Sequence, residues 1–188
     1  MSEVSNGSTP LAAASAAGAP PAVPAAASGW RWLPLAAAVI AADQAVKAWI
    51  VHHFVLFERV QVLDVLDFIL TYNTGAAFSF LADAPGWQRW LFVLLALGVS
   101  TALLVWMRRL RASAQGLLAC GLALIVGGAL GNMVDRLARG RVVDFIHVHA
   151  GGAYFPAFNL ADSAITVGAA VLLFDAWRES RATQRRRT

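Results

Sequence analysis

In the stretch NLADSAITVGAAVLLF, residues 159–174, the acidic residue Asp162 lies at the start of an apolar run. A second carboxylate, Asp144, lies 18 residues before Asp162, in VVDFI. Ionisable side chains at or within a membrane helix cost free energy, and for this reason they often mark a functional site. The two aspartates are therefore the first candidates for chemistry, and the apolar run that follows them is the first candidate for a membrane span.

The composition is that of a membrane protein. Hydrophobic residues make up 59% of the 188 residues and charged residues only 14%, against about 25% charged residues in an average soluble domain. Four apolar runs, at about 32–51, 90–107, 116–134 and 161–177, each approach the ~20 residues that a helix needs to cross the hydrocarbon core. We therefore predict an α-helical integral membrane protein with four transmembrane helices.

Basic residues at the helix ends predict the orientation. Arg31 precedes the first run. Further arginines follow the second and the fourth runs: Arg108, Arg109, Arg111, Arg178, Arg181, Arg185, Arg186 and Arg187. The positive-inside rule places these ends, and with them both termini, in the cytoplasm. This distribution also argues against a nucleic-acid-binding face.

The segments at about 52–89 and 135–160 are then outside. Three arginines of the second outer segment break the positive-inside rule: Arg136, Arg139 and Arg141. We expect them to pair with acids or with lipid headgroups. The stretch VQVLDVLDFILTYN, residues 60–73, is rich in β-branched residues and predicts one or two strands. Asn73 then begins a predicted turn.

Three parts of the chain differ in composition. Residues 1–29 are almost entirely Ala, Pro, Ser and Gly, with Glu3 as the only charge, and such a segment cannot bury enough apolar surface to fold. We predict a disordered cytoplasmic tail at 1–29, a four-helix membrane domain at 30–180, and a basic cytoplasmic tail at 181–188.

Asp144 and Asp162 could form a catalytic pair. Two carboxylates brought close together share a proton, and aspartic proteases use that arrangement to activate water and protonate a carbonyl oxygen. Each aspartate also has a structural alternative. Asp162 could be the third residue of a helix capped by Asn159, and Asp144 could form an ion pair with Arg136 or Arg141. The residues alone leave these alternatives open.

Asp43 and Lys47 lie in the middle of the first predicted helix, four residues apart. They share one helix face and can pair, and the cost of burying them predicts that they face the bundle interior or a wet cavity. A buried brace between helices and a direct part in chemistry are both compatible with this pattern.

The third predicted helix ends in GGALGNMVDR, residues 127–136. Gly127 and Gly131 form a GxxxG pair, which predicts the close approach of another helix. Helix packing explains the glycines. It does not explain the three polar residues that lie within positions 132–136: Asn132, Asp135 and Arg136.

Other classes of site are weakly supported. His147 and His149 would share one face of a strand, but no HExxH or comparable metal-binding spacing is present. Cys120 is the only cysteine, which excludes an internal disulfide and a cysteine-based zinc site. We expect neither a metal nor another cofactor.

Five sequence blocks, in order, resemble one family, the bacterial lipoprotein signal peptidases, also called type II signal peptidases. The blocks are DQAVK (43–47), NTGAAFSF (73–80), GGALGNMVDR (127–136), VVDF (142–145) and FNLADSAI (158–165). The resemblance covers about residues 30–180. It implies a multi-pass protein of the bacterial inner membrane, with both termini cytoplasmic, the active site at the outer face, and an extracytoplasmic β-sheet platform with a mobile lid.

The resemblance also implies the chemistry. The family consists of aspartyl peptidases without a cofactor, which cut diacylglyceryl-modified prolipoproteins before the lipidated cysteine and are inhibited by globomycin. Its catalytic aspartates correspond to Asp144 and Asp162. Its supporting polar residues correspond to Asp43, Lys47, Asn73, Asn132, Arg136 and Asn159. We expect a monomer that contacts membrane lipids and prolipoprotein substrate and binds no nucleic acid.

Two other functions are compatible with parts of the sequence. A proton-coupled transporter also carries acids within its spans, but it predicts a charged path across the membrane, whereas the acids here gather at the outer edge. A structural subunit that binds partner helices through GxxxG would leave both aspartates without a purpose.

Overall fold

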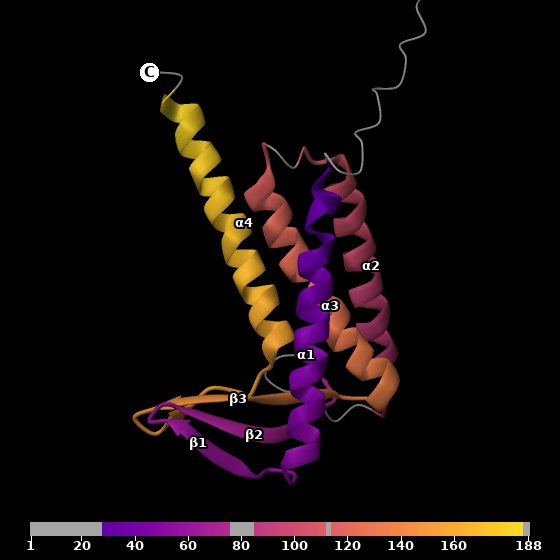
Figure 1. The fold of residues 1–188 in the computed structure, drawn as a ribbon, viewed down its shortest axis with the longest axis vertical. Coiled ribbons are helices and arrows are strands. Elements are labelled where there is room, and N and C mark those ends of the chain that lie inside the picture. The colour runs from indigo at the N-terminus through magenta and orange to yellow at the C-terminus, as the bar shows by residue number, and fades with distance from the viewer. Residues whose placement is uncertain (1–27, 76–84, 112–113, 186–188) are drawn as a thin grey trace, which may run out of the picture.

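A computed structural model describes residues 28–75, 85–111 and 114–185. Its helices are α1 (Leu33–His53), α2 (Trp87–Arg109), α3 (Gly116–Arg139) and α4 (Leu160–Arg185). All four are long and apolar enough to cross a membrane, which confirms the predicted class. Figure 1 shows them side by side, with a small sheet under one end of the bundle that projects past the base of α4.

Local sequence sets the helix boundaries. Pro34 lies in the first turn of α1, where its missing N–H is not needed. Gly140 ends α3 with φ 75°, a left-handed conformation that glycine adopts without strain. The helices extend beyond the predicted apolar runs because polar turns continue them outside the apolar core. α4 therefore runs to Arg185, past the predicted end of the membrane domain at residue 180.

The sheet is antiparallel and contains β1 (Arg59–Leu63), β2 (Leu66–Asn73), β3 (Val142–Ala150) and β4 (Ala153–Tyr154), in that order. The predicted strand region at 60–73 is thus confirmed as a hairpin. Opposite β3, the N–H groups of Phe145 and Ile146 both donate to the carbonyl oxygen of Phe158, at 3.0 and 2.8 Å. Two successive donors on one acceptor mark a β-bulge, which changes the direction of the side chains that follow.

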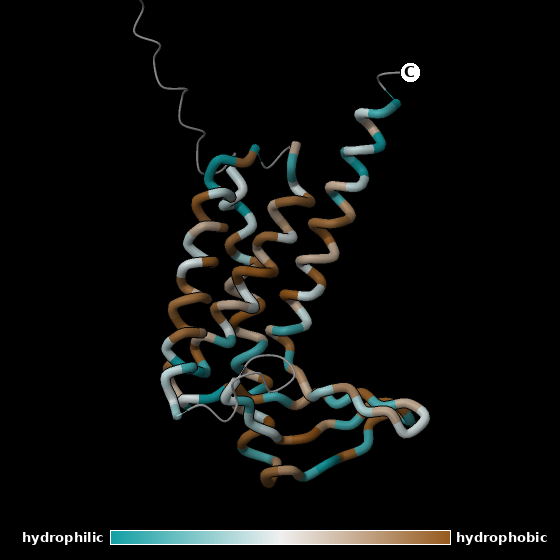
Figure 2. Tube along the Cα trace, turned by 180° about the vertical axis from the view of Figure 1, so that it is seen from behind, coloured by the Kyte–Doolittle hydropathy of each residue, from teal (hydrophilic) through white to brown (hydrophobic). Residues whose placement is uncertain are grey.

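Helix α3 lies at the centre of the bundle. Half of its apolar window is buried, against 17–22% in the other three helices. Figure 2 shows apolar residues along the length of the helices and hydrophilic residues at the end opposite the sheet. Close approach depends on glycine: a Cβ on Gly127 would lie 2.9 Å from the Ala36 carbonyl oxygen of α1, as the GxxxG pattern predicts.

Gly128 permits the contact between α3 and α4. A Cβ there would overlap the Ala161 carbonyl oxygen and lie 2.7 Å from Ile165 Cγ1. Because the first of these atoms is backbone, Gly128→Ala should destabilise the protein by about 1–3 kcal/mol, as overpacking does, and lower Tm in detergent. Gly98→Ala on α2 is the matched control, since nothing lies within 4 Å of its new Cβ. Equal Tm values for the two variants would contradict this packing.

Contacts at the end opposite the sheet begin at Ser28. The N–H of Gly29 donates to the Leu110 carbonyl oxygen at 3.1 Å, and Trp30 Nε1 donates to the Leu104 carbonyl oxygen at 3.0 Å. The predicted tail at 1–29 otherwise lies outside the described residues. Residues 76–84 of the first outer segment also lie outside them, and the lid that the resemblance implies for the outer segments stays a prediction.

Candidate active site

Asp144 and Asp162 line one cavity of about 940 Å³ at the sheet end of the bundle. Asp144 is in β3 and is 3% exposed, and Asp162 is in the first turn of α4. Three of the predicted supporting residues line the same cavity: Asn73, Asn132 and Arg136. The fold therefore brings together side chains from β2, α3, β3 and α4 that are far apart in sequence.

Asn159 caps α4, as one structural alternative predicted. The Asp162 N–H donates to Asn159 Oδ1 at 2.9 Å, and the Asn159 N–H donates to Asp162 Oδ2 at 3.3 Å, the reciprocal pattern of a capping box. The other oxygen, Asp162 Oδ1, accepts from Asn132 Nδ2 at 2.7 Å. Capping therefore does not exclude a catalytic role, because it holds the carboxylate in place while Asp162 still faces the cavity.

The predicted ion pair of Asp144 with an arginine is wrong: within the described ranges Asp144 forms no salt bridge. Arg136 instead donates to the Gly75 carbonyl oxygen at 2.9 Å. The Arg141 guanidinium lies over the Tyr72 ring, 3.6 Å from its centroid. Arg136 and Arg141 therefore contact a backbone carbonyl and an aromatic ring, and their contacts with lipid headgroups stay a prediction. Arg139 does pair with an acid, Asp135, as expected.

The environment of Asp144 favours its neutral form. Burial first, and the nearby carboxylate of Asp162 second, raise the pKa of Asp144 to about 7. Hydrogen bonds from Asn159 and Asn73 act in the opposite direction but do not offset burial. The Asn159 bond is short, with Nδ2 at 2.7 Å from Asp144 Oδ1. A carboxyl group that keeps its proton near neutral pH can serve as a general acid.

Asn132 and Asn159 connect the two aspartates. Asn159 Nδ2 lies 3.2 Å from Asn132 Oδ1 and also donates to Asp144, while Asn132 Nδ2 donates to Asp162. Lys47 Nζ donates to Asn132 Oδ1 at 2.9 Å. The ammonium group can only donate, so it fixes which end of the Asn132 amide points to Asp162.

Lys47 is the centre of a buried brace. It is 0% exposed and pairs with Asp43 at 2.8 Å and with Asp135 at 2.9 Å. Asp43 Oδ1 accepts the N–H of Ala161, next to Asp162, at 3.0 Å. Asp135 Oδ2 accepts the N–H of Val143, next to Asp144, at 3.1 Å. The brace thus holds both backbone segments that carry the aspartates.

Three members of this brace were not among the predicted site residues: Gln44, Asp135 and Arg139. Gln44 Nε2 donates to the Gly131 carbonyl oxygen at 3.1 Å and to Asp135 Oδ1 at 3.2 Å. Arg139 pairs with Asp135, so two acids, Asp43 and Asp135, are balanced by two cations. The i,i+4 spacing of Asp135 and Arg139 was a usable signal, and so was the position of Gln44, a polar residue beside Asp43 in the middle of the first apolar run.

No three His, Cys, Asp or Glu side chains in the described part of the chain are placed to hold a metal ion together. His147 and His149 do lie on one face of β3, as predicted, and both turn towards the carboxylate of Asp67.

The family model described as Signal peptidase (SPase) II matches residues 35–178, which include every residue discussed above for the site. The chain belongs to the signal peptidase II family. The match extends over most of the membrane domain and includes the brace as well as the two aspartates. The chain is therefore a membrane peptidase of lipoprotein processing, and the resemblance of the five sequence blocks is confirmed.

Curated relatives of this signal peptidase II chain are named lipoprotein signal peptidase. The protein from Shewanella oneidensis is 50% identical over 159 residues, which cover 84% of this chain and 92% of that protein. The protein from Pseudomonas aeruginosa is 51% identical over 155 residues, with coverages of 81% and 90%.

Solved structures agree with the fold of this signal peptidase II chain. A bacterial membrane enzyme solved at 2.3 Å resolution superposes with a TM-score of 0.72 at 27% identity and covers 80% of this chain and 90% of its own. A second bacterial membrane enzyme, at 1.9 Å, gives a TM-score of 0.68 at 28% identity, with coverages of 78% and 92%.

Proposed function

We propose that this signal peptidase II chain removes the signal peptide from diacylglyceryl-modified prolipoproteins with Asp144 and Asp162 as its catalytic pair, cutting before the lipidated cysteine. One observation carries the proposal: two acids from different elements line one cavity at the end of a membrane helix, each held by an asparagine amide at 2.7 Å. A lipid-modified substrate presents its scissile bond at this depth, because its acyl chains and signal helix are both in the bilayer.

The two acids have different roles in the first step. Asp144 holds the shared proton, since its pKa is raised to about 7, and donates it to the carbonyl oxygen of the scissile bond. Asp162 accepts two N–H groups, from Asn132 and from the backbone of Asn159, which favour its ionised form, and it takes a proton from the attacking water. The roles reverse when the leaving amine is protonated.

The supporting residues position these acids. Asn132 and Asn159 hold the carboxylates, Asn73 donates to Asp144, and Arg136 orients the turn at Gly75 that borders the cavity. Asp43 and Lys47 act further back, through the brace. None of these residues needs a metal or another cofactor for its role.

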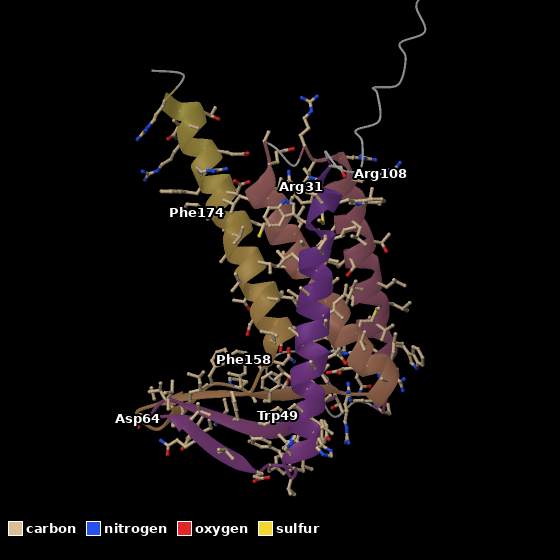
Figure 3. All side chains as sticks on the ribbon, viewed as in Figure 1. Arg31, Trp49, Asp64, Arg108, Phe158 and Phe174 are labelled. Carbon is tan, nitrogen blue, oxygen red and sulfur yellow. The ribbon has the colours of Figure 1, made fainter. Side chains whose placement is uncertain are left out.

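We place the sheet end of the bundle outside the bacterial inner membrane. Figure 3 shows Arg31 and Arg108 at the end opposite the sheet, and the positive-inside rule assigns that end, with both termini, to the cytoplasm. The membrane domain at 30–180 then works as a monomer between two cytoplasmic tails, 1–29 and 181–188. Substrate and lipid reach the cavity from the outer leaflet, and globomycin inhibits by occupying the cavity.

A reconstituted cleavage assay tests this function. Purified protein in lipid should convert a diacylglyceryl-modified prolipoprotein to the shorter form on a gel, and mass spectrometry should place the cut before the modified cysteine. The unmodified prolipoprotein is the matched control and should remain uncut, and globomycin should stop the reaction. A folded protein that cuts neither form would favour the transporter alternative.

The pH dependence follows from Asp144. Its pKa is raised from 3.8 to about 7, so the proton-donating form is present below pH 7 and is lost as the pH rises through 7. With an uncharged substrate, kcat/KM should fall by about tenfold per pH unit above 7. Asn73→Ala should move this limb to higher pH, because the Asn73 hydrogen bond lowers the pKa of Asp144. A flat profile from pH 6 to 9 would contradict the assignment of Asp144 as the acid.

A further inference from the structure

One face of the sheet forms the floor of the catalytic cavity. Alternate residues of a strand share a face, and alternate residues of β2 and β3 line the cavity: Ile69, Thr71, Asn73, Val142 and Asp144. The first two turns of α4 line it as well, with Asp162 among them. A substrate peptide in the cavity therefore lies between this floor and α4.

Thr71 is the floor residue directly opposite Asp144. The two residues pair in the register of β2 and β3. Directly opposite residues of an antiparallel pair have their side chains on one face, with Cβ atoms about 4.5–5.5 Å apart, and both of these side chains do line the cavity. Successive Cα atoms of a peptide are about 3.8 Å apart, so Thr71 lies within about one residue of a carbonyl group that Asp144 protonates.

Other polar side chains near the two acids are engaged within the protein. The amides of Asn132 and Asn159 each donate to one of the aspartates, and Arg136 donates to a backbone carbonyl oxygen. The hydroxyls of Ser163 and Thr166 donate to carbonyl oxygens four residues earlier. Each of these groups thus already serves the structure of the protein itself.

The Thr71 hydroxyl differs from these groups. Thr71 is half-buried, and its hydroxyl has no hydrogen-bond partner among the described residues of the protein. A threonine hydroxyl has one donor and two acceptor lone pairs. A peptide group that leaves water for a cavity needs a partner, because an unpaired one costs free energy. The Thr71 hydroxyl can supply that partner beside Asp144.

The short side chain of Thr71 favours a partner in the substrate backbone. Its hydroxyl is attached to Cβ and therefore stays close to the floor, where a peptide lying on the sheet brings its N–H and C=O groups. The neighbouring floor positions of β2 are Ile69, which is apolar, and Asn73, which already donates to Asp144. Thr71 is thus the position of this strand at which a side chain can bind the substrate backbone.

We propose that Thr71 is a substrate-binding residue of this peptidase, and that its hydroxyl forms a hydrogen bond with a backbone peptide group next to the scissile bond. This inference rests on the proposed function and adds a residue that lies outside the five sequence blocks. The hydroxyl exchanges no proton in the reaction. It holds the peptide so that the carbonyl oxygen of the scissile bond lies at Asp144.

Thr71→Val tests this role, because valine has a similar shape and keeps the β-branched side chain that suits a strand. The assay measures kcat and KM of the full-length protein in lipid with a diacylglyceryl-modified peptide. The ratio kcat/KM should fall by about three- to tenfold, as the loss of one neutral hydrogen bond predicts. The loss should appear in KM, with kcat unchanged. Thr71→Ser retains a hydroxyl and should restore most of the affinity.

Thr101→Val is the matched control. Thr101 is exposed on α2 and does not line the cavity, so its replacement should change neither KM nor kcat. Tm in detergent is measured for all three variants. Equal Tm values for Thr71→Val and Thr71→Ser would show that a difference in KM between them does not come from folding.

Ester substrates locate the hydrogen bond. In two further substrates the peptide bond immediately before or immediately after the scissile bond is replaced by an ester, which removes the N–H group and weakens the carbonyl oxygen as an acceptor. At one of these positions the KM ratio of Thr71→Val to wild type should fall towards one. The reason is that of a double-mutant cycle: the substrate has already lost the partner of the hydroxyl.

Wild-type KM and kcat in Thr71→Val would overturn this inference and leave the proposed function intact, whereas a wild-type protein that cleaves no diacylglyceryl-modified peptide would remove both. A loss confined to kcat would place the hydroxyl on the attacking water. A KM ratio that neither ester changes, or a KM in Thr71→Ser as high as in Thr71→Val, would exclude a bond from the hydroxyl to the neighbouring backbone. Each of these results would also overturn the inference.

Discussion

Cleavage of a diacylglyceryl-modified prolipoprotein should fall by at least about a thousandfold in Asp162→Asn and in Asp144→Asn, because each variant removes one half of a unit that shares a proton. Asparagine matches aspartate in shape. In Asp162→Asn it retains an oxygen that can accept the N–H of Asn159, so α4 should stay capped. The loss should therefore appear in kcat, measured by single-turnover cleavage, with the protein still folded and inserted.

Stability separates catalysis from folding in these variants. In the folded protein Asp144 holds its proton up to about pH 7, whereas the unfolded chain releases it near 3.8. The group therefore destabilises the fold increasingly as the pH rises from 3.8 to 7. Asp144→Asn removes this cost, so its Tm in detergent at pH 8 should exceed that of wild type by a few degrees.

Asp64→Asn is the control for both measurements. Asp64 is exposed at the tip of the sheet, far from α4 (Figure 3), and its replacement should change neither cleavage nor Tm. Normal turnover by Asp144→Asn or Asp162→Asn would remove that acid from the mechanism.

Lys47→Met should destabilise the protein by about 3–5 kcal/mol, the usual cost of removing one partner from a buried ion pair. Methionine has a similar length and fills the space, so the loss reports charge more than volume. Asp43 and Asp135 would remain buried without the ammonium group that lies 2.8 and 2.9 Å away. The measurement is Tm and the fraction of folded protein after purification, and cleavage should fall as well because Asn132 loses its orienting donor.

Two further variants make the Lys47 result specific. Arg178→Met breaks the Asp175–Arg178 pair, in which Arg178 is 56% exposed and Asp175 is 6% exposed. Because solvent reaches the guanidinium of this pair, its loss should cost less than the loss of the fully buried Lys47. Lys47→Met combined with Asp135→Asn should recover part of the lost stability, because one of the uncompensated charges is gone. If the Lys47→Met and Arg178→Met proteins had the same Tm, the brace would not be a major source of stability.

Much of the architecture could be predicted from local pattern. In a membrane, an apolar run of spanning length satisfies its backbone hydrogen bonds as a helix. The four apolar runs alone therefore predicted the four helices. The cap at Asn159 and the Asp43–Lys47 pair also followed, because both depend on residues three or four apart on one helix. Helix ends were less predictable, and α4 continues to Arg185 because polar turns extend a helix after its apolar core has ended.

Contacts between residues distant in sequence could not be predicted from local pattern. Nothing near Asp135 in the sequence indicates that it accepts the Val143 N–H and pairs with Lys47 from another helix. The competing ion pair of Asp144 with Arg136 or Arg141 was plausible from spacing. It fails because Arg136 reaches Gly75 and Arg141 stacks on Tyr72 in the folded chain.

The sequence by itself determined the membrane helices, the Asn159 cap of α4, the small sheet and the two acids that the family motifs carry, because each depends on short-range periodicity or on residue type. Only the tertiary structure decided what surrounds those acids. The buried brace, the raised pKa of Asp144 and the contacts of His147 and His149 with Asp67 arise where helices and strands distant in sequence exclude water from the same groups. Burial of that kind is a property of the packed chain and of no single segment.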